Sequence, residues 1–170
     1  CGSAAGQGPV VFMDTGPAAA LGALHDERVG GAAESLVMNL GNMHLLAFHL
    51  RGRRIASLFE HHTGEVTSEQ IESFAMQLCA GTLQHEAVFN SKGHGAFHAD
   101  RSLVRPAVPA TVAATGPRRV KIRETALAPY FAAPLGDMMI GGCFGLLRGF
   151  GECNPAAGEA IASSLGPVPG

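Results

Sequence analysis

The strongest constraint on the fold is a succession of three apolar segments separated by two tight turns. Segments and turns follow one another as residues 35–40, Gly41-Asn42, residues 44–50, residues 51–53 and residues 54–59. Each turn contains glycine, which readily adopts the positive backbone dihedral angles of a short hairpin connection. The pattern therefore predicts three antiparallel strands joined in sequence order, a meander.

A second clear signal is an amphipathic helix that begins near Thr67 and Ser68. A hydroxyl there can accept hydrogen bonds from the free amides of the first turn, and Glu69 and Gln70 fall within that turn. Apolar residues then recur at three- and four-residue spacing, until Gly81 ends the pattern.

The remaining elements are expected on both sides of these two. They are a strand buried on both faces at residues 9–13, a helix at 17–24, a short helix near 83–89, a strand at 108–114, a short helix within 120–133, a glycine-rich buried helix near 143–150 and a last helix in the tail from residue 154. Antiparallel strands followed by strand–helix units predict a mixed sheet covered by helices, in one domain of the α/β class.

Composition and charge exclude several kinds of partner. Twelve Lys and Arg residues against fourteen Asp and Glu residues give a net charge of −2, too little positive charge for a broad nucleic-acid-binding face. The longest apolar stretch, residues 126–150, is interrupted by prolines, glycines and Asp137, which argues against a membrane span. We therefore expect no nucleic-acid partner, no membrane partner and a cytoplasmic location.

The four cysteines are scattered along the chain and form no CxxC pair. An iron–sulfur cluster needs clustered thiolates, so none is expected. Cys79 and Cys143 lie among apolar residues, and both are expected to be buried as small hydrophobic side chains.

Glycine turns follow three of the expected strands. They are Asp14-Thr15-Gly16, the segment 39–42 and the segment 115–119. Glycine lets backbone amides approach an anion closely, and a following helix start or arginine adds positive potential. The three turns predict a shared crevice for a phosphorylated ligand at one sheet edge, although each alone is also compatible with an ordinary connection. Arg118 and Arg119 fit either phosphate binding or a solvated surface.

Histidines form the other group of candidate functional residues. Glu60, either His61 or His62, and His94 could together bind a divalent metal ion or transfer protons. Because adjacent residues on a strand point to opposite faces, His61 and His62 cannot both face one site. The alternative is that these histidines only pack the second helix onto the sheet.

Taken together, these motifs resemble the second half of an actin-like ATPase, the superfamily of sugar kinases, heat-shock chaperones and actin. Residues 17–24 and 141–147 resemble its two connecting helices, residues 36–44 its second phosphate loop and residues 110–117 its adenosine strand and turn. The resemblance implies a ribonuclease H-like lobe at residues 31–153, preceded by a strand and connecting helix at 9–30. Residues 1–8 are then a flexible arm and residues 154–170 a C-terminal tail.

Four shorter strings are similar to a prokaryotic domain family of unknown function. They are residues 41–44, 59–64, 93–96 and 136–139. Members of that family often carry the label putative pyruvate formate-lyase activating enzyme. The label implies a radical enzyme with three clustered cysteines, which this sequence lacks, so we discount the label as a guide to activity.

The leading hypothesis is a lobe that binds ATP or ADP with Mg²⁺, or another small phosphorylated ligand, at the glycine turns. The phosphate-binding residues are then Asn39, Gly41, Asn42 and His44, and the nucleoside-side residues are Thr115, Gly116 and Arg118. Superfamily ATPases usually carry aspartate at the position of Asn39, and their first phosphate loop belongs to a preceding lobe. That lobe is expected upstream of Cys1 as a partner, and no catalytic residue is assigned within this chain.

Two alternatives come from other functional classes. The first is a metal-dependent enzyme that uses Glu60, His61 or His62, and His94. The second is a non-catalytic interaction domain in which the histidines are structural.

Overall fold

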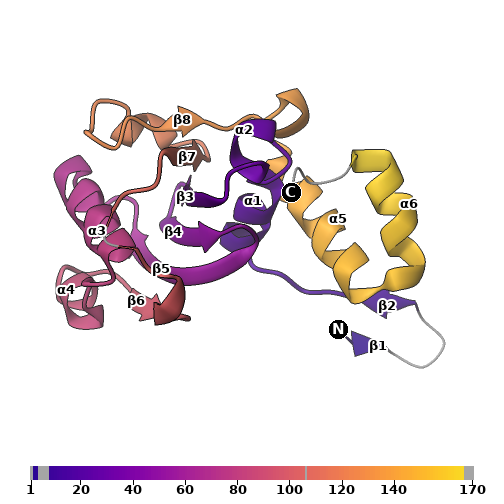
Figure 1. Cartoon of the computed structure of the whole chain (residues 1–170), viewed down its shortest axis with the longest axis horizontal. Coiled ribbons are helices and arrows are strands. Elements are labelled where there is room, and N and C mark those ends of the chain that lie inside the picture. The colour runs from indigo at the N-terminus through magenta and orange to yellow at the C-terminus, as the bar shows by residue number, and fades with distance from the viewer. Residues whose placement is uncertain (1, 4–7, 106, 167–170) are drawn as a thin grey trace.

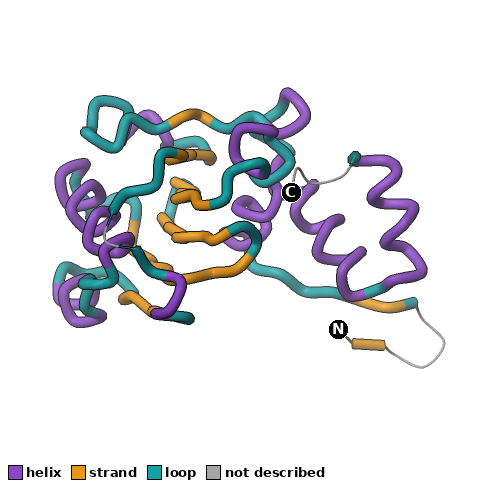
Figure 2. Tube along the Cα trace, viewed as in Figure 1, coloured by secondary structure: helices purple, strands orange, loops and turns teal. Residues whose placement is uncertain are grey.

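The computed structural model describes residues 2–3, 8–105 and 107–166, and its centre is a six-stranded mixed sheet. The strands lie side by side in the order β6-β5-β4-β3-β7-β8. Their bounds are β3 Glu34–Leu40, β4 His44–Arg51, β5 Arg54–His62, β6 Gly95–His98, β7 Thr111–Thr115 and β8 Tyr130–Phe131. Figure 2 shows helices on both sides of these strands, which confirms the predicted α/β class.

The predicted meander is confirmed, with β3, β4 and β5 paired antiparallel in sequence order. The first turn closes through the Gly41 amide, which donates to the His44 carbonyl at 2.9 Å. In the second turn Gly52 has a φ of +53°, a left-handed conformation that is costly for residues with a Cβ atom.

β3 is a central strand, with antiparallel β4 on one side and parallel β7 on the other. Its side chains alternate between two cores, as the two-residue period of a strand requires. Leu36 and Met38 belong to one core, and Val37 belongs to the other. All three are fully buried, so the sheet needs a helical layer on each face.

The first core is covered by helix α3 (Ser68–Ala80), the amphipathic helix predicted from its N-terminal signal. The Thr67 hydroxyl accepts from the Gln70 amide, and the Gln70 side chain accepts from the Thr67 amide. Gly81 ends the helix in a left-handed conformation. Both predicted boundaries are therefore confirmed.

The second core is covered by helix α1 (Thr15–Ala23). Helix α5 (Gly141–Cys153) packs against α1, and helix α6 (Pro155–Leu165) packs against α5. Figure 1 shows the resulting layers, with α3 on one side of the sheet and α1, α5 and α6 following one another on the other side.

Several short elements connect these layers. They are β1 Gly2–Ser3, β2 Pro9–Val10, α2 Glu27–Gly30, α4 His85–Asn90 and 3₁₀ turns at Arg101–Leu103, Arg119–Ile122 and Pro134–Gly136. No helix in the described part of the chain combines the length and apolar character needed to cross a membrane.

The expected buried strand at residues 9–13 was wrong. Only Pro9–Val10 is a strand, it pairs with Gly2–Ser3 outside the main sheet, and Phe12 is 94% exposed. A short apolar run indicates extended backbone but carries no information on which strand it pairs with. The rest of the predicted arm, residues 1 and 4–7, and the tail end, 167–170, lie outside the described residues.

Two local expectations, the short helix within residues 120–133 and the buried Cys143, also differ from the structure. Residues 120–133 contain a 3₁₀ turn and the edge strand β8, and β6 is a further strand that was not predicted. Cys143 is exposed because it lies on a face of α5 that does not contact α1. Asp137 precedes α5 without capping it, and its carboxylate accepts from the Met139 amide at 2.7 Å.

Candidate functional site

A cavity of about 310 Å³ lies where β3 and β7 end. These strands are parallel neighbours, and Asn39 of β3 pairs with Thr115 of β7. Their glycine turns therefore leave the sheet side by side at one edge. The cavity is lined by Thr15, Ala19, Asn39, Gly41, Asn42, Thr115, Gly116, Pro117, Met138, Met139 and Gly142.

The two turns interlock closely at Gly116. This glycine has a φ of +92°, and a Cβ atom there would lie 2.5 Å from the Leu40 carbonyl oxygen and 2.8 Å from Asn39 Oδ1. The Leu40 carbonyl also accepts from the Arg118 amide at 3.0 Å. Only glycine allows this approach of the two backbones, so the position of the turns relative to each other is set by Gly116.

First-turn residues of two helices line the same cavity. Thr15 is the first residue of α1, and Gly142 lies in the first turn of α5. Neither N-cap residue, Asp14 or Ile140, makes a side-chain cap hydrogen bond. First-turn amides and the helix dipole give such N-termini a partial positive charge that attracts anions.

Asn42 lines both this cavity and a second one, and Arg118 contacts it there. Its Nε donates to Asn42 Oδ1 at 3.2 Å, and both residues line a neighbouring cavity of about 410 Å³. The other lining residues of that second cavity are Thr63, Gly64, Val120 and Lys121. Arg119 points elsewhere, since its Nη1 donates to the Gly116 carbonyl at 3.0 Å and so supports the turn.

The structure thus brings together five of the seven residues expected around a nucleotide. Asn39, Gly41, Asn42, Thr115 and Gly116 line the first cavity. Arg118 lines the second cavity, and His44 lines neither of them. Thr15 belongs to the third glycine turn, which was expected at the same crevice. The sequence analysis did not assign Met138, Met139 and Gly142 to this cavity. The adjacent glycines at positions 141 and 142 were the one sequence signal that could have indicated a close backbone approach there.

His44 instead belongs to a histidine cluster with His62 and His94. The ring centroids lie 5.1 Å apart for His44 and His62, 4.9 Å for His44 and His94, and 4.5 Å for His62 and His94. Glu60 completes the group, with Oε1 3.4 Å from His44 Nδ1. The structure therefore brings together two of the expected metal ligands, His62 and His94. The third member of the cluster, His44, was expected to bind phosphate instead.

His61 lies on the opposite face of β5, as the strand period requires. It is fully buried, its ring stacks on Phe74, and its Nε2 lies 3.1 Å from Ser91 Oγ. His61 therefore packs α4 and the following loop onto the sheet, which is the structural role kept as an alternative for these histidines.

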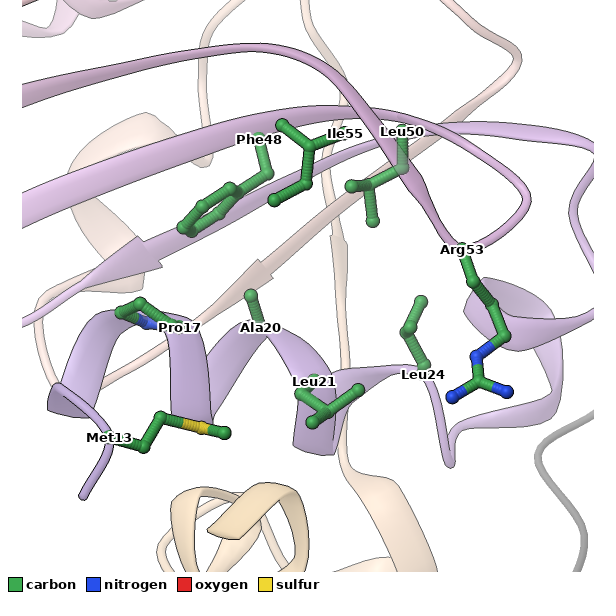
Figure 3. A pocket seen from close by; sticks show the side chains of 9 residues that line it. All are labelled: Met13, Pro17, Ala20, Leu21, Leu24, Phe48, Leu50, Arg53 and Ile55. Atoms are coloured by element: carbon green, nitrogen blue, oxygen red, sulfur yellow. The ribbon is translucent and has the colours of Figure 1, made fainter. Parts of the chain in front are cut away.

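A third cavity, of about 190 Å³, lies between α1 and the strands β4 and β5. Figure 3 shows its lining side chains, which are Met13, Pro17, Ala20, Leu21, Leu24, Phe48, Leu50, Arg53 and Ile55. Arg53 is the one charged residue among them, and its Nη2 pairs with Glu152 Oε1 at 2.5 Å. This lining suits an apolar ligand. The Arg53 guanidinium is its one group that could bind phosphate, and it is already paired with Glu152.

The chain belongs to the DUF1786 family, described as "Putative pyruvate format-lyase activating enzyme", whose sequence pattern matches residues 3–121. No curated protein matches the chain. No solved structure matches it either. The match confirms the family resemblance carried by the strings around Gly41, Glu60 and His94.

An iron–sulfur cluster needs several cysteine thiolates close together, and the described cysteines are far apart. Cys79 is buried in α3, whereas Cys143 and Cys153 are exposed on α5. Ten residues of helix separate the latter two by about 15 Å, too far for shared ligation of one cluster. The described cysteines therefore do not fit an iron–sulfur centre.

Proposed function

We propose that this chain is a nucleotide- or phosphate-ligand-binding lobe of the actin-like ATPase type. The observation that carries the proposal is the cavity at the ends of β3 and β7. Two glycine turns border it, and first-turn residues of α1 (Thr15) and α5 (Gly142) line it. The proposed ligand is ATP, ADP or another small molecule that carries a phosphate group.

The chemistry of this cavity suits phosphate oxygens. Backbone amides of the turns and helix starts donate hydrogen bonds without the conformational entropy cost of ordering long side chains. The exposed Asn42 adds a side-chain amide at the rim, and Arg118 and Lys121 of the neighbouring cavity add positive charge. Local potential at the site thus favours an anion although the chain as a whole is slightly acidic.

The sheet topology supports the same assignment. A three-strand meander followed by a helix and by strands parallel to β3 is the arrangement that the resemblance to a ribonuclease H-like lobe implies. Helices α1 and α5 contain the segments that resemble the two connecting helices, and they pack directly against each other. In this proposal residues 31–153 form the lobe and residues 9–30 connect it to a preceding lobe.

The same cavity argues for binding without turnover by this chain alone. None of the described residues that line it carries a charged side chain, and Asn39 stands where related ATPases place an aspartate. Phosphoryl transfer needs positioned phosphates, Mg²⁺ and a group that orients the attacking nucleophile. Mg²⁺ would therefore arrive with the nucleotide phosphates, and a catalytic group would have to come from the preceding lobe.

The test is calorimetric titration of the chain with ADP, ATP and pyrophosphate, each with and without Mg²⁺. We expect saturable binding, and we expect Asn42→Ala to weaken it by about tenfold because hydrogen bonds to charged groups are worth about 1.5–3 kcal/mol. The matched control is Asn90→Ala, an exposed asparagine at the end of α4. Absence of binding by all three ligands at millimolar concentration would overturn the proposal, as would equal affinity of the Asn42 variant and the parent chain.

A further inference from the structure

The three histidines of the cluster come from three different segments that meet at one end of the sheet. His44 begins β4, His62 ends β5, and these two residues are directly paired across the strands. His94 lies in the loop before β6, where its amide donates to the Glu60 carbonyl at 2.9 Å. The backbone therefore fixes the position of all three residues before any ligand is present.

Strand periodicity directs the side chains to one face. Glu60 and His62 are two residues apart on β5, and His44 opposes His62 on the neighbouring strand. One ring nitrogen from each histidine lies within 4.8 Å of the other two. This is a convergent donor set rather than a row of separate surface histidines.

The loop that carries His94 is held tightly on both sides. A Cβ atom on Gly93 would lie 2.5 Å from the His61 ring, and one on Gly95 would contact the ring of His85. Gly95 also has a φ of +123°, a backbone conformation that residues with a Cβ atom rarely adopt. The Gly93-His94-Gly95 string thus presents His94 toward the cluster on a closely packed backbone.

We propose that His44, His62 and His94 bind one divalent transition-metal ion of the zinc class, with Glu60 as the carboxylate partner of His44. Imidazole nitrogen is a preferred ligand for Zn²⁺. Zn–N bonds of about 2.0 Å in tetrahedral geometry put ligand atoms roughly 3.3 Å apart. Since His44 and His94 are exposed, small rotations of their side chains close the present separations.

The position of Glu60 matches the usual support of a metal-bound histidine. A carboxylate that accepts from one ring nitrogen fixes the tautomer and leaves the other nitrogen for the metal. Glu60 Oε1 lies 3.4 Å from His44 Nδ1, so His44 Nε2 is the nitrogen available for the metal. Three protein ligands leave a fourth position for water or an anion, the arrangement of catalytic rather than structural zinc sites.

Other histidines of the chain show what a purely structural role looks like here. His49 is fully buried and lies 2.7 Å from Glu34, and His98 Nε2 lies 3.0 Å from the Leu83 carbonyl oxygen. The three cluster rings instead contact one another, and only His44 has a carboxylate beside it. Packing therefore explains His49 and His98 but leaves the convergence of the cluster unexplained.

The experiment uses the whole chain purified without a histidine tag, loaded with Zn²⁺ and dialysed against metal-free buffer before elemental analysis. We expect about one equivalent of zinc to be retained, and Co²⁺ substitution to give the visible absorption bands of a tetrahedral site. A convergent three-histidine site retains zinc through dialysis, whereas adventitious surface binding does not survive it, so retention of less than half an equivalent overturns the proposal.

Variants locate the site within the chain. His62→Ala and His94→Ala should each lower zinc affinity at least about tenfold, while Glu86→Ala, which removes an exposed carboxylate of α4 outside the cluster, should not. Circular dichroism checks that the variants fold. If His94→Ala does not fold, the conservative change His94→Gln replaces it. Zinc binding that survives in a folded His62 or His94 variant would assign the metal to other residues and overturn the proposal.

Discussion

Gly145 of α5 lies directly against the backbone carbonyl of Ala18 of α1, so closely that a Cβ atom on Gly145 would overlap that oxygen. Gly22 of α1 and Gly141 of α5 meet in the same way one turn further along. Small residues thus repeat at four-residue spacing on both helices, which brings the two backbones into contact. The two pairs run in opposite directions along the helices, so α1 and α5 pack antiparallel and the first turn of α5 lies against the last turn of α1.

Replacing Gly145 by alanine should therefore destabilise the chain. The added methyl group meets a backbone carbonyl, which cannot move aside as a flexible side chain can, and overpacking of this kind costs about 1–3 kcal/mol. Urea unfolding followed by circular dichroism measures the change in the free energy of unfolding.

Gly142→Ala is the matched control on the same helix. No atom lies within 4 Å of a Cβ atom built at Gly142, so the same change should leave stability unaltered or raise it by up to about 1 kcal/mol. Equal destabilisation by both substitutions would contradict the close-packing argument.

The capping box of α3 gives a second prediction. The Thr67 hydroxyl accepts from the Gln70 amide at 3.2 Å, and removing it leaves that amide without its cap. Thr67→Ala should lower the free energy of unfolding by about 1 kcal/mol, whereas Thr67→Ser should retain most of the stability. Thermal unfolding of the two variants side by side checks this, and an equal loss in both would show that the hydroxyl is not the stabilising group.

Locally encoded features of this chain could be predicted from its sequence. The meander follows from two glycine turns, and α3 follows from a capping signal at Thr67 and a stop at Gly81. Each of these signals operates within a few residues, so no knowledge of distant contacts is needed. The convergence of Asn39 and Thr115 needs one long-range contact in addition, the parallel pairing of β3 with β7.

Features that depend on distant partners could not be predicted in this way. Phe12 looks like a core residue in the sequence but is exposed, because it lies beyond the short strand Pro9–Val10, which itself pairs only with Gly2–Ser3 outside the main sheet. β6 is four residues long and exists because it pairs with β5. His44 was grouped with its sequence neighbour Asn42, although strand pairing places its side chain beside His62.

Cys79 should be chemically silent in the folded chain. Burial, assisted by the negative charge of Glu34, raises the pKa of this thiol to about 12, so almost no thiolate exists near neutral pH. In a Cys1→Ser, Cys143→Ser, Cys153→Ser variant, a disulfide reagent at pH 8 should react only after denaturant is added. Rapid reaction without denaturant would show that α3 opens far more readily than its packing indicates.

His25 should make the chain less stable in mild acid. Burial, together with the nearby positive charges of Arg148 and Arg53, lowers the pKa of this histidine in the folded state. The unfolded chain, with an ordinary histidine pKa near 6.5, then takes up the proton first as the pH falls. The free energy of unfolding should therefore decrease as the pH drops below about 6.5, through the interval between the unfolded and folded pKa values.

Unfolding at pH 7.5 and pH 5.5 measures this effect. His25→Leu should show a smaller loss of stability between the two pH values than the parent chain, whatever its stability at pH 7.5. Gln84→Leu, which changes an exposed side chain that does not titrate, should keep the parent's pH dependence. An unchanged pH dependence in the His25 variant would assign the acid sensitivity to other groups.

The two proposed binding sites should be separable although they share one hairpin. Asn42 lines the cavities at the ends of β3 and β7, whereas His44, two residues later, lies at the histidine cluster. Asn42→Ala should therefore weaken ADP binding about tenfold and leave zinc retention unchanged, and His62→Ala should do the reverse. Calorimetry and elemental analysis on both variants provide the four measurements. If either folded variant lost both zinc and ADP binding, metal and nucleotide would occupy one composite site. In that case a substitution at one residue of the hairpin would weaken the binding of both ligands.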